Sequence, residues 1–199
     1  MLRASLFVTI ALVLNSARAA DLPPPMPEAE RAVLVSKWRK GYDAALAKVK
    51  DEIAEAKVLS KDIASAGEGK IMLMRANTRL AVMTKSPELY GGGFTTVFEG
   101  AKGQVGRLAQ SSLTVAEVNT EGTVVEGVAI RRPANPFVVG EEKVTVRYLV
   151  VSSLPDAKKG ATVSLNGLWY VAGDMEHNGK KIPVLYRFEI KKDEMPAKE

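Results

Sequence analysis

Residues 168–190 read LWYVAGDMEHNGKKIPVLYRFEI, and this stretch decides the fold of more than half the chain. Asn178-Gly179 is a strong hairpin signal, because both residues tolerate the left-handed backbone that a two-residue turn requires. The residues after the turn alternate, as in a strand with one buried face. That face holds Val184, Tyr186, Phe188 and Ile190. The stretch therefore predicts an antiparallel β-hairpin.

The same pattern of short apolar runs and turn residues extends back to Gly91. Asn119-Thr120-Glu121-Gly122 predicts another hairpin turn, and residues 133–140 and 155–160 predict loops. Several short strands at this spacing are typical of a small barrel or sandwich. We expect a small antiparallel β-barrel domain over residues 70–190. Its main strands are predicted at 105–108, 113–118, 123–130, 144–151 and 163–173.

Residues 70–85 fit two structures. As a helix they place Arg75 and Arg79 on a mixed face, and as strands they form a hairpin that turns at Asn77-Thr78. Periodicity does not separate a helix from strands in so short an apolar run. We prefer the strand interpretation.

Residues 28–66 predict one long amphipathic helix, with Gly67 and Gly69 as its stop. Its apolar stripe packs either on the chain's own β-domain, which we prefer, or on a second copy as a short coiled coil that would make a homo-oligomer. The chain is thus expected to be α+β. The residues at this helix interface are Val35, Trp38, Tyr42 and Val49.

The N-terminus predicts export. Residues 1–19 have a basic start at Arg3, an apolar run over 6–14 and the small-residue exit Ala17-Arg18-Ala19 of a secretory signal peptide. The apolar run is too short to cross a bilayer core of about 30 Å. We expect cleavage before Ala20 and a periplasmic or secreted protein.

The two segments that border the folded part are predicted to be extended. Residues 20–27 hold four prolines between 22 and 27 and predict a Pro-rich spacer. Residues 191–199 are charged and predict a disordered tail. No segment after residue 19 is long and apolar enough to be embedded in a membrane.

Composition excludes several kinds of chemistry. The chain has no cysteine, which removes disulfides, thiol catalysis and thiolate metal sites. After residue 19 it has 26 basic and 23 acidic side chains, a balance too weak to predict nucleic-acid binding.

Four segments resemble the small OB-type or SH3-like barrels of uncharacterised exported bacterial proteins. The resemblance implies a barrel that opens with a Gly-x-x-Gly strand and has a late strand ending in glycine. It implies no activity, since fold does not determine function. The segments are residues 102–108, 115–118, 167–173 and 182–185.

No catalytic constellation is predicted. The one histidine, His177, precedes a turn and is expected to be exposed, with Asp174 and Glu176 too weak a cluster for a metal. Gly91-Gly92-Gly93 lacks the lysine of a phosphate loop. Glu117, expected on the face of Leu113 and Val115, could serve a carboxylate hydrolase with Glu121 and Glu126. We expect no catalytic residue, metal or cofactor.

One basic and aromatic set is a candidate binding patch for anionic polymers or glycans. Because neighbouring strand residues point to opposite faces, at most one of its two aromatic residues should be exposed. The expected function is non-enzymatic binding of a protein or an anionic glycan or polymer of the cell envelope. Self-assembly through the helix and hydrolysis at a carboxylate site are the alternatives. The patch comprises Arg131, Arg132, Trp169, Tyr170, Lys180 and Lys181.

Overall fold

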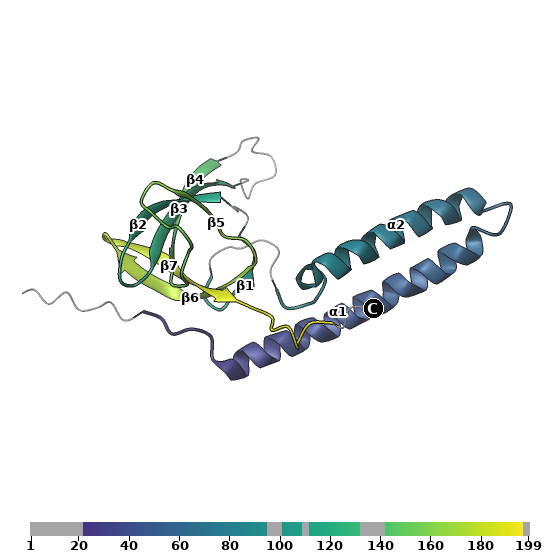
Figure 1. The fold of residues 1–199 in the computed structure, drawn as a ribbon, viewed down its shortest axis with the longest axis horizontal. Helices are drawn as coiled ribbons and strands as arrows, with labels where there is room; N and C mark the ends of the chain where they lie inside the picture. The colour runs from purple at the N-terminus through teal and green to yellow at the C-terminus, as the bar shows by residue number, and fades with distance from the viewer. Residues whose placement is uncertain (1–21, 95–100, 109–111, 132–141, 197–199) are drawn as a thin grey trace, which may run out of the picture.

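A computed structural model describes residues 22–94, 101–108, 112–131 and 142–196. The fold is α+β: two helices followed by a curled, mixed seven-stranded sheet that forms a half-barrel (Figure 1). The predicted signal peptide lies outside the described residues. The helices are α1 (Glu28–Leu59), α2 (Ala66–Lys85) and a short 3-10 turn, η1 (Pro87–Leu89). The strands are β1 (Val105–Gly106), β2 (Ser112–Val118), β3 (Thr123–Arg131), β4 (Glu142–Val150), β5 (Thr162–Ser164), β6 (Leu168–His177) and β7 (Lys180–Phe188).

The two helices form an antiparallel hairpin that projects from the sheet (Figure 1). Apart from Trp38 on α1, their buried residues recur every seven positions, so each helix has one narrow buried stripe. Small side chains at the far end let the helices approach closely, and a β-carbon on Gly69 would overlap the backbone of Leu59 and Ser60. The stripes are Val35, Tyr42, Val49 and Ala56 on α1, and Gly69, Ala76 and Met83 on α2.

The helical part differs from the sequence prediction in two ways. The strand interpretation of residues 70–85 is wrong, because they belong to α2. The single helix over 28–66 ends instead at Leu59, and Gly67 and Gly69 lie inside α2 rather than stopping α1. Asp62 holds the connecting turn, where its carboxylate accepts hydrogen bonds from the Ala64 amide and the Ser65 hydroxyl. Such side-chain bonds compete with helix propagation.

The sheet has the strand order β1-β6-β7-β4-β3-β2-β5. Every described pairing is antiparallel except that of β4 with β7, which is parallel. The expectation of a purely antiparallel barrel is therefore wrong in this respect. The sheet ends at β1 and β5 without these two strands pairing with each other, so the structure is a half-barrel.

Both faces of β6 are covered, which follows from the alternation of its side chains. Trp169 and Val171 enter the sheet core, which the curled strands enclose. Leu168, Tyr170 and Ala172 enter the helix-facing core, which also receives the α1 stripe. One strand thus joins two apolar cores.

The segment before α1 is extended, as its prolines predict, but it lies against the sheet instead of standing free. The Tyr186 hydroxyl donates a hydrogen bond to the Pro23 carbonyl at 2.9 Å. Leu22 and Met26 pack on buried clusters of the β-domain. In the described part, residues 22–27 therefore belong to the folded unit.

The prediction of a disordered tail is wrong for residues 191–196, which dock on α1. The Glu194 carboxylate accepts two hydrogen bonds from the Arg31 guanidinium, at 2.9 and 2.6 Å, and one from the Lys191 amide at 2.7 Å. Met195 packs on the helix-facing core. A charged composition predicts a solvated tail, but here the Glu194 carboxylate forms an ion pair with Arg31 of α1.

The tail contact predicts a pH dependence. The hydrogen bonds from Arg31 hold the pKa of Glu194 below its ordinary value of 4.5, and the Lys191 amide adds to this effect. A pKa lowered by folding contributes stability above the unfolded pKa, and this stability is lost as the pH falls through the folded pKa. Glu194→Gln is therefore expected to lower the free energy of unfolding by about 1 kcal/mol at pH 7. The difference in unfolding free energy between the parent protein and Glu194→Gln should disappear below pH 4.5, as Glu194 becomes protonated.

Denaturant unfolding of both proteins at pH 7 and pH 3 measures this effect. Glu189→Gln is the matched control, since the Glu189 carboxylate is exposed and lies 3.8 Å from Arg187. An equal loss for Glu194→Gln at both pH values would show that the carboxylate charge does not hold the tail.

Candidate functional site

The predicted basic and aromatic patch is not assembled in the described part of the chain. Trp169 and Tyr170 are both buried, one in each core. The Trp169 indole donates its hydrogen bond to the Leu165 carbonyl at 3.1 Å, and the Arg187 guanidinium covers its ring at 5.3 Å. Neither aromatic face is open to a glycan.

The basic members of the patch lie elsewhere. Lys180 and Lys181 are exposed and pair with the far end of β6, whereas Trp169 pairs with Arg187. His177, the partner of Lys180, lies eight positions along β6 from Trp169, or roughly 25 Å at 3.3 Å per residue. The side chain of Arg131 and all of Arg132 lie outside the described residues.

The four predicted helix-interface residues do come together. Val35, Trp38, Tyr42 and Val49 are all buried in the helix-facing core. There they meet β-strand residues, including Tyr170 and Phe188, and Met83 of α2. The cluster joins α1 to α2 as well as to the sheet within a single chain.

The predicted carboxylates are dispersed. A β-bulge shifts the register, so that Val115 pairs with Val125 but Glu117 pairs with Val124. The bulge turns Glu117 away from the face of Val115, which corrects the expectation that they share one face. Glu117 Oε2 lies 3.4 Å from His177 Nε2. The His177 imidazole is half-buried, whereas its position before a turn predicts that it is exposed.

Glu126 has a separate partner on the neighbouring strand. Its carboxylate accepts a hydrogen bond from Arg147 Nε at 3.0 Å. Among the described residues, no three histidine or acidic side chains converge as a metal site would require. No described helix is long and apolar enough to cross a membrane.

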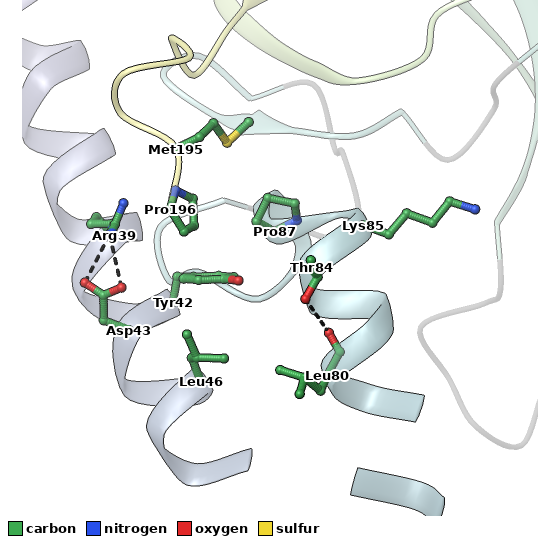
Figure 2. A pocket seen from close by; sticks show the side chains of 10 residues that line it. All are labelled: Arg39, Tyr42, Asp43, Leu46, Leu80, Thr84, Lys85, Pro87, Met195 and Pro196. Carbon is green, nitrogen blue, oxygen red and sulfur yellow. Dashed lines mark hydrogen bonds and ion pairs between the residues drawn. The ribbon is translucent and has the colours of Figure 1, made fainter. Parts of the chain in front are cut away.

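A groove of about 680 Å³ lies where the helical hairpin meets the C-terminal tail. This volume is within the range of sites that bind small molecules or side chains. Figure 2 shows that its walls come from four separate segments, which are α1, α2, η1 and the tail. Its lining residues are Arg39, Tyr42, Asp43, Leu46, Leu80, Thr84, Lys85, Pro87, Met195 and Pro196.

The groove is apolar between an ion pair at one border and a lysine at another. Leu46 and Leu80 contribute one aliphatic side chain from each helix. At one border Arg39 Nε donates hydrogen bonds to both carboxylate oxygens of Asp43, at 3.0 and 3.1 Å. Lys85 lies at another border and points away from the other lining side chains (Figure 2). Such a lining accepts apolar groups and leaves a cation free to meet an anionic one.

The polar groups inside the groove are already engaged. The Thr84 hydroxyl donates to the Leu80 carbonyl at 2.9 Å, within its own helix. The Asp43 carboxylate is held by Arg39. Pro87 stands beside Trp38, whose indole donates to the Pro87 carbonyl at 3.3 Å and fixes η1 against α1.

Sequence reasoning missed this groove because its parts are distant in the chain. More than 150 residues separate Arg39 from Pro196. One available signal was the alternative helix over residues 70–85, which would have predicted a helical hairpin with a shared apolar seam. No family model, curated protein or solved structure matches this chain.

Proposed function

We propose that this is an exported, non-enzymatic binding protein that holds apolar side chains of a partner protein in the groove between the helical hairpin and the tail. The observation that carries the proposal is the groove itself, about 680 Å³ with Leu46, Leu80 and Met195 in its lining. Export rests on the sequence of residues 1–19.

The walls of the groove favour binding over structural filling. Tyr42 is buried in the helix-facing core, so this wall is fixed before a partner arrives. A preformed site spends less binding energy on ordering its own side chains. The tail wall is held by the Arg31–Glu194 ion pair and by Met195, which packs on the helix-facing core.

The apolar lining favours a protein segment over an anionic glycan. A glycan site needs exposed aromatic faces or several free hydrogen-bonding groups, and here Thr84 and Asp43 are bound within the chain. Self-assembly through Val35, Trp38, Tyr42 and Val49 would have to uncover residues that are buried in a single chain. A carboxylate hydrolase has less support, because Glu117 and Glu126 have separate partners.

Binding of 1-anilinonaphthalene-8-sulfonate tests the groove, since this dye joins an apolar body to one anionic group. We expect saturable binding of one dye per chain. Leu80→Gln should weaken it by about tenfold, because burial of an aliphatic side chain contributes roughly 1.5–3 kcal/mol. Fluorescence titration measures both values.

Val58→Gln is the matched control, since Val58 lies on the same hairpin, is 70% exposed and does not line the groove. Circular dichroism of both variants must show an unchanged fold. Equal dye binding by Leu80→Gln and Val58→Gln would contradict the proposal, as would dye binding that appears only when the protein unfolds.

A further inference from the structure

The outer face of α2 carries an apolar stripe that neither core uses. Ile71, Met74 and Val82 are 50%, 63% and 41% exposed. Their spacing puts them on one side of the helix, opposite Gly69, Ala76 and Met83. This outer stripe is thus the reverse of the face that packs on α1.

Thr78 lies within the outer stripe but does not present a free polar group to the surface. Its hydroxyl donates a hydrogen bond to the Met74 carbonyl at 2.9 Å, so its polar group is satisfied inside the helix. The helix has 20 residues and is therefore about 30 Å long. From Ile71 to Val82 the stripe covers about half of that length, roughly 17 Å.

The positive charge of the chain is concentrated on this helix. Four basic residues and one acidic residue, Glu68, lie on α2, while the rest of residues 20–199 hold 22 of each sign. Arg79 pairs with Glu52 of α1 at 2.8 Å. Lys70, Arg75 and Lys85 have no ion pair with any other described residue. An apolar stripe beside cations that no described residue neutralises is typical of helices that lie on anionic membranes.

The charge decides between occupants. A second copy would bring the same cations against Lys70, Arg75 and Lys85, and like charges oppose such pairing. A protein partner would need an acidic groove shaped to a convex helix, whereas the lipid interface adapts to it. We propose that α2 is a membrane-surface helix, which docks through the outer stripe on a bilayer containing anionic phospholipid.

Cosedimentation with lipid vesicles tests this docking. The chain from residue 20 is mixed with vesicles of phosphatidylcholine alone or with 30% phosphatidylglycerol. We expect binding to the anionic vesicles only, and its loss in high salt. Replacing Lys70, Arg75 and Lys85 together with glutamine should weaken binding by about 100-fold, because each basic residue near such a surface contributes about fivefold.

A second variant tests the stripe, with Ile71, Met74 and Val82 replaced by serine. Its matched control replaces Val33, Val118 and Ile130, which are 67%, 52% and 58% exposed and lie on other elements. Only the α2 variant should lose vesicle binding. Equal binding by the two variants, or no binding of the parent chain to anionic vesicles, overturns the proposal. Light scattering is the third measurement. If the parent chain is an oligomer and the α2 variant is a monomer, the stripe is a protein interface and the proposal is overturned.

Discussion

Replacing Trp38 with alanine is expected to lower the free energy of unfolding by about 3–5 kcal/mol, the usual loss for truncating a buried aromatic side chain. Trp38 is fully buried at the junction of α1, η1 and the sheet. Its ring lies 5.9 Å from that of Tyr42 and 6.4 Å from that of Phe94. Truncation removes these contacts and leaves a cavity.

The same substitution also removes a hydrogen bond that fixes η1. The indole donates to the Pro87 carbonyl, and Pro87 lines the groove. Gly91 lies against the indole so closely that a β-carbon there would overlap the ring. Trp38→Ala should therefore loosen the groove as well as the core.

Urea unfolding followed by circular dichroism measures the loss. Val33→Ala, on the exposed side of the same helix, should change the stability by no more than about 0.5 kcal/mol. A loss below about 1 kcal/mol for Trp38→Ala would mean that the hairpin and the sheet do not share one core.

The second large effect is expected at Gly69, where alanine should destabilise the protein by about 1–3 kcal/mol, as overpacking does. A β-carbon at Gly69 would overlap the backbone of Leu59 and Ser60, which cannot move as a side chain would. The substitution must therefore push α2 away from the end of α1, even though alanine is the better helix former.

Gly67 supplies a control of opposite sign two residues away. A β-carbon there meets nothing within 4 Å, so Gly67→Ala should leave the packing intact. It should stabilise the protein by up to about 1 kcal/mol through helix propensity. Thermal unfolding of the two variants compares them directly. If both stabilise the protein, the close approach at Gly69 is not part of the native packing.

The sequence predicts the strands better than the helices. Alternation correctly places Val184, Tyr186 and Phe188 on one face of β7, because a strand with one face buried has a period of two. It fails for α2, since that helix has apolar residues on both sides. The inner side carries small residues such as Gly69 and the outer side carries Ile71 and Met74, so no single stripe marks its period.

The predicted aromatic patch and the predicted carboxylate face are both wrong, for two physical reasons. The alternation of Trp169 and Tyr170 is correct, but helices cover the face that would otherwise meet solvent, and so both rings are buried. Before Glu117 a β-bulge adds one residue to β2, so that the side chains after the bulge point to the opposite face of the sheet. Neither the partner of a face nor the place of a bulge can be read from the period of one strand.

The position of β7 determines when the molecule can fold. This last strand lies in the middle of the sheet, between β6 and β4, and its Phe188 ring packs at 5.4 Å on that of Phe94. A nascent chain that ends before residue 180 has two unconnected sets of strands and an α1 stripe without its sheet partners. The complete sheet therefore cannot form until nearly the whole polypeptide has been synthesised, and contacts between such distant residues form slowly.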